Sequence, residues 1–237
     1  MKVTYSWILP IKNEAESLPQ LLEEITQVMR DKKYSSKGRP ASGWEIIAVN
    51  DASTDSSLSI LKSFTAVKIL TFASPQGKWA ALKAGFEAAQ GQIIITSDSD
   101  LQDDPNEMRK LLTKFNQGYD LVSGWRKTRQ DIFYKVWISN LGNKFASILN
   151  GHRFHDLNSP FKIYQREVLE NIPQEGSLLR FSNLFAKKLG YKVSEVPIIH
   201  RPRLYGRSKF GIVKYLRIIY DLFLVMLLFT GSGRLKK

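Results

Sequence analysis

The amino-acid sequence predicts an α/β fold with a mostly parallel central sheet, and three observations support this prediction. Over the first two thirds of the chain, short apolar runs alternate with stretches whose apolar residues recur at helical spacing. The runs at 45–49 and 92–96 are largely apolar, which is typical of strands covered on both faces. Hydrophobic residues make up 43% of the 237 positions, which is enough apolar surface for a large core.

Periodicity places the first elements. Residues 3–10 alternate as a strand with Val3, Tyr5, Trp7 and Leu9 on one face, and residues 18–29 form an amphipathic helix. The apolar stripe of this helix consists of Leu18, Leu21, Leu22, Ile25, Val28 and Met29. Ser17 and Gln20 predict a capping box at its start, where Pro19 suits the first turn.

The remaining elements follow from shorter signals. Residues 34–43 are rich in Gly, Pro and Ser and predict a loop, and Gly91 is expected to close the helix that begins at Lys78. The further predicted strands are 45–49, 67–72, 92–96, 120–124, 161–164 and 193–200, and the further helices are 78–90, 105–117, 132–149 and 178–189. No linker or repeat divides the chain, so we predict one domain followed by an amphipathic C-terminal segment.

Charge and cysteine content narrow the possible functions. The formal net charge of +13 favours an anionic partner such as nucleic acid, a membrane surface or a phosphorylated substrate. Six of the basic residues lie within 201–217 without an acidic one, although such a run is also typical of a solvated helix face. The lack of cysteine excludes a disulfide scaffold, a cysteine nucleophile and a thiolate metal site, and it fits a reducing compartment.

The two ends of the chain bear on membrane contact. The N-terminus does not have the pattern of a signal peptide, because its apolar stretch is short and alternates with polar residues. Residues 222–229 are apolar throughout but fall short of the roughly 20 residues that a membrane-spanning helix requires. Three interpretations stay open: a helix in the membrane interface, a helix docked on the domain, or the start of a longer membrane region.

Polar residues gather where three predicted strands end, at 10–14, 50–55 and 98–104. Ligands of parallel sheets bind beyond the carboxyl ends of the strands, so these segments predict a site. Asp98, Asp100 and the amide oxygen of Gln102 are candidate ligands for Mg²⁺ or Mn²⁺. The alternative for this acidic cluster is a helix cap before Pro105, which fits the next two residues, Asp103 and Asp104, better.

Other residues could bind a nucleotide or a phosphate. Asp51 could accept a hydrogen bond from a base or a ribose, while Asp55 is expected to cap the next helix. Gly77 and Lys78 open a helix in a way that suits phosphate, but neither a GxxxxGK[ST] nor a GxGxxG pattern is present. The candidate cationic phosphate ligands are Arg126, Arg129, Arg203 and Lys209, with Ser208 beside the last of these. The three histidines, His152, His155 and His200, lack zinc-ligand spacing and are taken as ordinary residues.

Seven segments in order resemble family 2 glycosyltransferases, and within them the dolichol-phosphate or polyprenyl-phosphate sugar synthases. The segments are PIKNE, VNDASTD, GKWAALKAGFEAAQG, SDSDLQDDP, SGWR, DLNSPFKIY and RPRLYGRSKFG. The resemblance covers nearly the whole chain. It departs from the family pattern at Asn50, where an Asp is common, and at Ser99, where an Ala is usual.

The resemblance implies a GT-A fold, a UDP- or GDP-sugar donor and inversion at the anomeric carbon. It implies a catalytic domain over 1–211 and a membrane-associating helix over 212–237. The implied donor ligands are Pro10, Glu14, Asp51, Asp98, Ser99, Arg203 and Lys209, and the implied metal ligands are Asp98, Asp100 and Gln102. The implied acceptor-phosphate ligands are Arg126, Arg129, Arg203, Ser208 and Lys209, with Asp100 and Arg126 as the catalytic residues.

The predicted function is therefore sugar transfer to a polyprenyl phosphate at the cytoplasmic face of a membrane. This reaction requires no strong general base, because the acceptor phosphate is already an anion near neutral pH. A hydroxyl acceptor is the alternative and would require a base, for which Asp103 and Asp104 are the candidates. A non-enzymatic basic module is the second alternative. Nucleic acid is disfavoured because few aromatic residues accompany the basic run. A membrane subunit or a homo-oligomer is compatible with the sequence.

Overall fold

The computed structural model describes residues 3–31, 43–127, 154–205, 221 and 225. The predicted helix over 132–149 and nearly all of the predicted loop over 34–43 lie outside the described residues, as do Arg129, Ser208 and Lys209. Of the C-terminal segment over 212–237, only Asp221 and Val225 are described.

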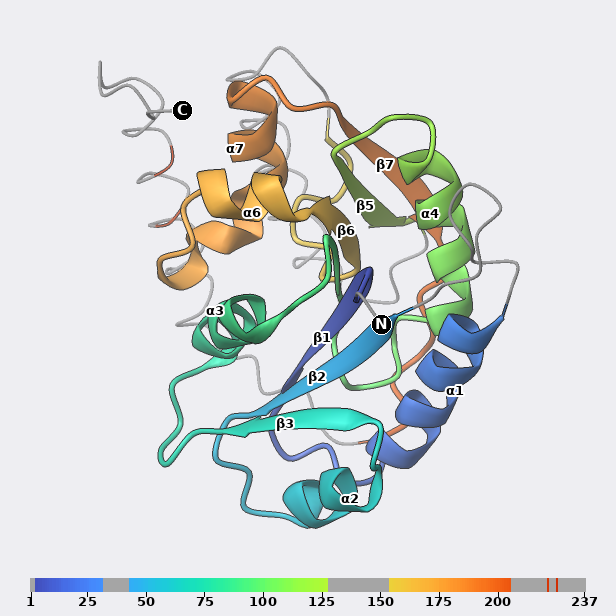
Figure 1. Ribbon diagram of the computed structural model, residues 1–237, viewed down its shortest axis with the longest axis vertical. Helices are drawn as coiled ribbons and strands as arrows, with labels where there is room; N and C mark the ends of the chain where they lie inside the picture. The colour runs from blue at the N-terminus through green and yellow to red at the C-terminus, as the bar shows by residue number, and fades with distance from the viewer. Residues whose placement is uncertain (1–2, 32–42, 128–153, 206–220, 222–224, 226–237) are drawn as a thin grey trace.

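The centre of the protein is a seven-stranded sheet in the order β3-β2-β1-β4-β6-β5-β7 (Figure 1). Its strands are β1 (Tyr5–Ile11), β2 (Trp44–Asn50), β3 (Val67–Thr71), β4 (Ile93–Thr96), β5 (Leu121–Arg126), β6 (Lys162–Gln165) and β7 (Val193–Ile198). Only β6 runs against its two neighbours, β4 and β5. The mostly parallel sheet predicted from the sequence is therefore confirmed, with every predicted strand of the described residues in place.

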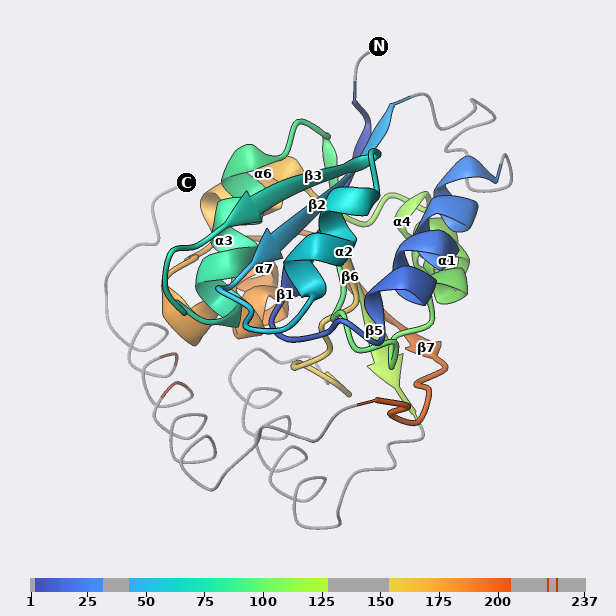
Figure 2. The same cartoon turned by 90° about the horizontal axis from the view of Figure 1, so that it is seen from below.

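Helices cover both faces of this sheet (Figures 1 and 2). They are α1 (Leu18–Arg30), α2 (Ser57–Ser63), α3 (Lys78–Ala88), α4 (Met108–Phe115), α6 (Arg166–Asn171) and α7 (Ser182–Lys188), with short 3₁₀ turns η3 (Pro105–Glu107) and η4 (Gly176–Phe181). Within β1, Trp7 packs into the core formed with α1 and α4, and Ile8 packs into the core formed with α3 and α7. Because both side chains are fully buried, β1 lies in the middle of the molecule.

The helix α1 shows how far periodicity alone predicts packing. All six residues of its predicted stripe are buried, and Pro19 lies in the first turn as expected. The predicted capping box is wrong, because the side chain of Ser17 makes no capping hydrogen bond. Its hydroxyl instead donates to the carbonyl of Ser99 at 2.7 Å, which ties the start of α1 to the loop after β4.

Gly91 also differs from its prediction. The helix α3 ends earlier, with Ala89 in extended conformation as its C-cap, so Gly91 does not close it. A Cβ at Gly91 would lie 2.7 Å from the backbone nitrogen and from Oγ of Ser6. The residue is therefore a glycine because β1 passes against it.

This contact predicts that Gly91→Ala lowers the free energy of unfolding by about 1–3 kcal/mol, because rigid backbone of β1 must shift to admit a methyl group. Urea unfolding monitored by circular dichroism measures the change. Gln90→Ala, at the exposed neighbouring position, is the matched control and is expected within about 0.5 kcal/mol of wild type. Equal stabilities of the two variants would contradict the packing argument.

Candidate active site

Three loops meet at the carboxyl edge of the sheet. The strands β1, β2 and β4 are adjacent and parallel, so the segments that follow them lie side by side. The hydroxyl of Ser99 donates to the carbonyl of Pro10 at 2.9 Å, which joins the loops after β4 and β1. Lys12 Nζ donates to the carbonyls of Asp51 at 2.7 Å and Ala52 at 2.5 Å, which joins the loops after β1 and β2.

Each of these loops contains one strained residue. Among the described residues, the only non-glycine positions with positive φ are Asn13 (53°), Ala52 (49°) and Leu101 (60°). The left-handed region costs Ala and Leu about 1–3 kcal/mol each, because it brings Cβ close to the backbone. Such strain persists where the surrounding contacts enforce it. Here the strained residues lie at the carboxyl edge of the sheet, where the sequence predicts the site.

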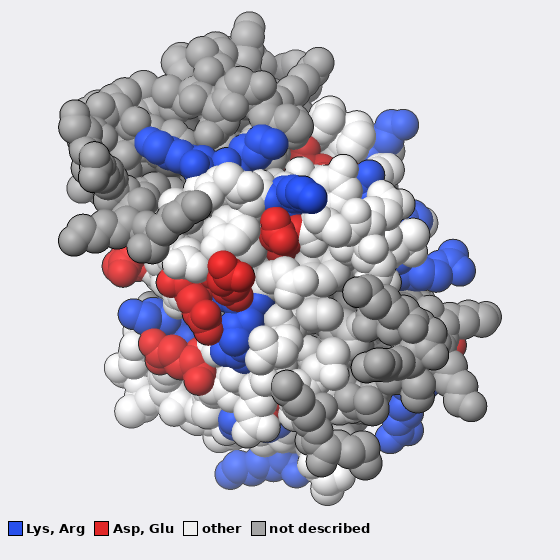
Figure 3. Space-filling model, turned by 45° about the horizontal axis from the view of Figure 1, so that its top comes forward, with Lys and Arg blue, Asp and Glu red and all other residues white. Residues whose placement is uncertain are grey.

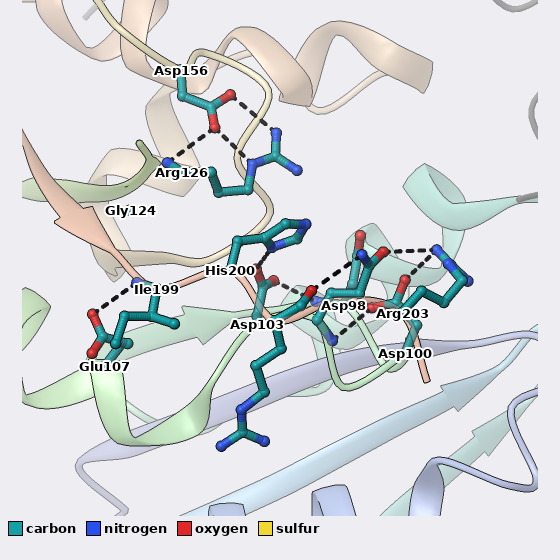
Figure 4. Close-up of polar contacts among 12 residues, drawn as sticks. Asp98, Asp100, Asp103, Glu107, Gly124, Arg126, Asp156, Ile199, His200 and Arg203 are labelled. Atoms are coloured by element: carbon teal, nitrogen blue, oxygen red, sulfur yellow. Dashed lines mark hydrogen bonds and ion pairs between the residues drawn. The ribbon is translucent and has the colours of Figure 1, made fainter. Parts of the chain in front are cut away.

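The three predicted metal ligands are held by the protein's own cations, and Figure 4 shows Arg203 beside Asp100. One guanidinium nitrogen of Arg203, Nη2, contacts Asp100 Oδ2 and lies 3.0 Å from Gln102 Oε1. Lys78 Nζ contacts Asp98 Oδ1. The oxygens of Asp100 and Gln102 thus converge on a single positively charged atom.

Asp100 is buried at 9% exposure, and its surroundings disfavour its charge. Burial raises its pKa, the nearby charges of Asp98 and Asp103 raise it further, and Arg203 acts in the opposite direction. A cation beside the carboxylate would relieve this cost.

The residues fit a divalent ion whose coordination is completed by oxygens of the substrate. No three His, Cys, Asp or Glu side chains gather into a metal site within the described parts of the chain. Mg²⁺ is, however, commonly held by one or two carboxylates together with substrate phosphates, and Asp98, Asp100 and Gln102 offer oxygen donors of that kind. The metal-ligand assignment therefore stays a prediction, and it is supported by the convergence of oxygens on Arg203 Nη2.

The two acids that follow have separate tasks. Asp104 is the cap of η3, as predicted: its Oδ1 accepts from the amide of Asn106 at 2.9 Å. Asp103 is not part of this cap, so the prediction is wrong for it. Its carboxylate is buried at 2% exposure, accepts from the amide of Asp98 at 3.3 Å and lies 3.6 Å from Nδ1 of His200. Asp103 therefore helps to hold the backbone at Asp98, the first residue of the metal triplet.

Asp51 closes the loop before α3. Its carboxylate is 6% exposed and accepts from the backbone amides of Gln76 at 2.6 Å and Gly77 at 3.0 Å. Gly77 has φ of +92°, which a glycine adopts without strain. Asp51 therefore positions the start of α3 and Lys78, and its predicted contact with a nucleotide stays a prediction.

Glu14 lies beside the same edge, where its backbone amide donates to the hydroxyl of Ser57 at 2.9 Å. Asp55 is not the N-cap of α2 as predicted, because that position is Ser56, but the carboxylate of Asp55 accepts from the amide of Ser57 at 2.9 Å in the turn that leads into the helix. Pro10 is positioned through the hydrogen bond of its carbonyl with Ser99. The structure thus brings together Pro10, Glu14, Asp51, Asp98, Ser99, Asp100, Gln102 and Arg203.

Arg126 forms a buried ion pair that no sequence pattern predicts. At the end of β5, its Nε and Nη2 donate to the two carboxylate oxygens of Asp156 at 2.7 and 3.1 Å. Burial disfavours the charged guanidinium, but Asp156 outweighs this effect and raises the pKa of Arg126. No spacing signal links residues 30 positions apart, so only the folded chain pairs them. The charges of Asp103 and Asp98 add to this increase in the pKa of Arg126, although its guanidinium is directed at Asp156.

The first two arginines of the basic run near the C-terminus are not simply solvated. Arg201 lies 2.8 Å from both Glu24 and Asp104, and Arg203 contacts Asp100, so the two arginines of this run that the structure describes are ion-paired. Acidic and basic side chains likewise lie near one another on the face shown in Figure 3.

Residues 6–173 match the protein family described as glycosyl transferase family 2. The chain belongs to this family. Two similar relatives are the undecaprenyl-phosphate 4-deoxy-4-formamido-L-arabinose transferase of Proteus mirabilis and the dodecaprenyl-phosphate galacturonate synthase of Rhizobium johnstonii. Both are 29% identical, over 222 and 238 residues, which cover 92% and 97% of this chain. The chain spans only about two thirds of the length of these relatives, 66% and 68% respectively.

Solved structures confirm the fold of this family 2 chain. The glucosyl-3-phosphoglycerate synthase of Mycobacterium tuberculosis, solved with Mn²⁺, UDP and glucosyl-3-phosphoglycerate, superposes with a TM-score of 0.72 at 18% identity. The match covers 98% of this chain and 82% of that one. The GT-A fold predicted from the sequence is therefore confirmed.

The C-terminal segment of the family 2 chain is described at two positions. Val225 is fully buried in the core beside α3 and α7, and Asp221 is 4% exposed, 3.7 Å from Arg180. Both positions agree with the interpretation in which this segment docks on the domain. Within the described residues, no helix combines the length and apolar character needed to cross a bilayer.

Proposed function

We propose that this family 2 glycosyltransferase moves a sugar from a nucleotide donor to a polyprenyl phosphate. The observation that carries the proposal is that the names of both relatives specify a polyprenyl phosphate as the acceptor. The match with each relative covers more than nine tenths of this chain. In the reaction, an oxygen of the acceptor phosphate attacks the anomeric carbon and the bond from that carbon to the nucleoside diphosphate breaks. The nucleoside diphosphate leaves with the electron pair, and the configuration at the anomeric carbon is inverted.

The geometry supports distinct tasks for the residues at the sheet edge. Asp98, Asp100 and Gln102 would hold Mg²⁺ or Mn²⁺, which offsets the negative charge on the departing diphosphate. Arg203, already at these oxygens, is positioned to turn to the phosphates of the donor. Pro10, Glu14 and Asp51 would contact the nucleoside, which is a UDP or GDP unit.

We assign acceptor binding to Arg126 and to three residues outside the described part of the chain. Arg126 would contact the acceptor phosphate with the part of its guanidinium that Asp156 leaves available, together with Arg129, Ser208 and Lys209. We further infer that the protein works at the cytoplasmic face of a membrane, where the polyprenyl phosphate is found, and that residues 212–237 contribute to this association although Asp221 and Val225 pack against the domain.

The structure favours the phosphate acceptor over a hydroxyl acceptor. A hydroxyl must lose a proton to a base, for which the sequence offered Asp103 and Asp104. Asp103 is buried beneath the triplet, and Asp104 is occupied by Asn106 and by Arg201 at 2.8 Å. A phosphate monoester is already ionised at neutral pH and requires no such base.

Paired acceptors test this proposal. The purified chain is incubated with Mn²⁺ or Mg²⁺, a panel of nucleotide sugars, and either polyprenyl phosphate or the matching polyprenol. We expect a lipid-linked sugar phosphate from the phosphate acceptor, with at least about 100-fold less product from the alcohol, because the alcohol has no placed base. Mass spectrometry of the extracted lipid measures both products. Faster transfer to the polyprenol would replace the proposal by its hydroxyl-acceptor alternative.

A further inference from the structure

A pocket lies beside the metal triplet, between α3, η4 and β6. Its wall includes Lys78 and Trp79 from the first turn of α3, Ser159 from the loop before β6, Lys162 from β6 and Arg180 from η4. Lys78 belongs to both places, because its Nζ contacts Asp98 while the residue lines the pocket. The pocket therefore adjoins the position predicted for the reacting groups, and no role assigned above uses it.

The pocket is lined by three cations and by no carboxylate in the part of the chain that the structure describes. Lys162 is 3% exposed and donates to the carbonyls of Leu157 and Arg180 and to Ser182 Oγ, at 3.3, 3.4 and 2.9 Å. Burial lowers the pKa of Lys162 to about 7, although more distant carboxylates act in the opposite direction. A bound anion would supply the nearby negative charge that this ammonium lacks.

Arg180 and Trp79 form a rigid side of the pocket. The guanidinium of Arg180 lies over the ring of Trp79, 5.4 Å from its centroid, and is held from behind by Asp221 at 3.7 Å. Arg180 is 5% exposed, so its charge acts in surroundings of low polarity, where attraction to an anion is stronger than in water.

Ser159 gives evidence for an anionic ligand that is independent of the cations in the pocket. The residue is 2% exposed, and its hydroxyl has no hydrogen-bond partner among the described residues. A buried hydroxyl without a partner costs about 1–3 kcal/mol, so its presence in a pocket wall calls for an acceptor from outside the chain. An anionic oxygen satisfies both this donor and the surrounding positive charge.

We propose that the pocket lined by Lys78, Ser159, Lys162 and Arg180 is an oxyanion subsite that receives an anionic oxygen group of one substrate. The group is either the phosphate of the acceptor or a carboxylate on the transferred sugar, as in a hexuronate. The choice between these sources rests on the proposed function, whereas binding of an oxyanion rests on the pocket alone.

Inorganic phosphate is the first probe, used with the whole chain, without metal or nucleotide and against chloride of matched ionic strength. We expect phosphate to raise the melting temperature of the wild type. We expect Ser159→Ala to weaken phosphate binding about 10- to 100-fold, which corresponds to the loss of one hydrogen bond to a charged group. Without phosphate this variant should be at least as stable as wild type, because the deleted hydroxyl is unpartnered.

Ser177→Ala provides the control, because Ser177 is a buried serine of η4 that does not line the pocket. It should keep the affinity of the wild type for phosphate. Absence of any phosphate-specific stabilisation in the wild type, or equal phosphate affinity in wild type and Ser159→Ala, would overturn the subsite. These readouts require no turnover, so they are independent of whether the proposed transfer reaction is correct.

Kinetics then distinguish the two sources of the oxyanion. A higher KM of Ser159→Ala for polyprenyl phosphate, with an unchanged KM for the donor, assigns the subsite to the acceptor phosphate. A higher KM for an acidic nucleotide sugar alone assigns it to a sugar carboxylate. If neither KM changes, the oxyanion does not belong to a substrate and this part of the inference is rejected.

Discussion

Asp100→Asn is expected to lower kcat for sugar transfer about 10³-fold while leaving the fold intact. Asparagine keeps the shape of the side chain but removes the negative oxygen that would hold the metal, and an active-site cation contributes several kcal/mol to transition-state stabilisation. Initial rates of lipid-linked product formation at saturating donor and metal measure this loss.

The stability of Asp100→Asn, unlike its turnover, should equal or exceed that of the wild type. The folded-state pKa of Asp100 is raised by burial and by Asp98, so the ionised carboxylate destabilises the folded chain at pH values above that pKa. The neutral amide removes this cost. The metal-free variant should therefore melt at or above the wild-type temperature near pH 7, and the difference should shrink as the pH falls through the raised pKa.

Asp104→Asn is the matched control for this experiment. It makes the same chemical change four residues along the chain, at the cap of η3 rather than at the metal triplet. Turnover should stay within about threefold of wild type, and stability should change by no more than about 1 kcal/mol, because Asn caps a helix about as well as Asp and only the ion pair with Arg201 is lost. Equal losses of turnover in the two variants would show that the acidic cluster acts only through general charge.

Arg126→Gln is expected to lower the free energy of unfolding by about 3–5 kcal/mol. The arginine side chain is 10% exposed and forms a two-point ion pair with Asp156, which is 3% exposed. Removal of the arginine leaves a buried carboxylate without its cation, and the cost of such a charge is large. Urea unfolding at neutral pH measures the change.

The double variant Arg126→Gln with Asp156→Asn separates the structural role of Arg126 from its proposed role at the acceptor phosphate. Because the stranded charge is removed, most of the lost stability should return. Turnover should stay at least about 100-fold below wild type, because the phosphate would still lack the guanidinium. If turnover returns together with stability, Arg126 acts only by holding Asp156.

Local signals were sufficient for most of the fold. The apolar stripe of α1 and the apolar runs of β2 and β4 are buried as predicted. A 3.6-residue periodicity indicates a helix covered on one face, and a continuous apolar run indicates a strand covered on both faces. Gly91 shows the limit of such signals. A glycine after a helical pattern suggests a cap, but its cause here is the close approach of β1, some 85 positions away in the sequence.

Some features of the candidate site could likewise be predicted from local signals, and others could not. Parallel strand ends predicted that the loops near Pro10, Asp51 and Asp98 would meet, because the carboxyl ends of neighbouring parallel strands lie at one edge. The partners within that edge could not be predicted, because they depend on long-range contacts. Asp103 faces His200 rather than a helix terminus, and Arg126 faces Asp156. The pocket around Lys162 likewise has no sequence pattern, since its wall comes from separate elements.

The most direct test of the account is formation of a lipid-linked sugar phosphate by the purified chain. Polyprenyl phosphate is incubated with each of a panel of UDP- and GDP-sugars, in parallel with Mn²⁺, with Mg²⁺ and with excess chelator, and the product is identified by mass spectrometry. The account predicts a sugar–phosphate–polyprenol product from at least one donor, formed with a divalent ion and lost at least about 100-fold under chelation. No product from any donor with either metal, or equal product with chelator, would contradict it.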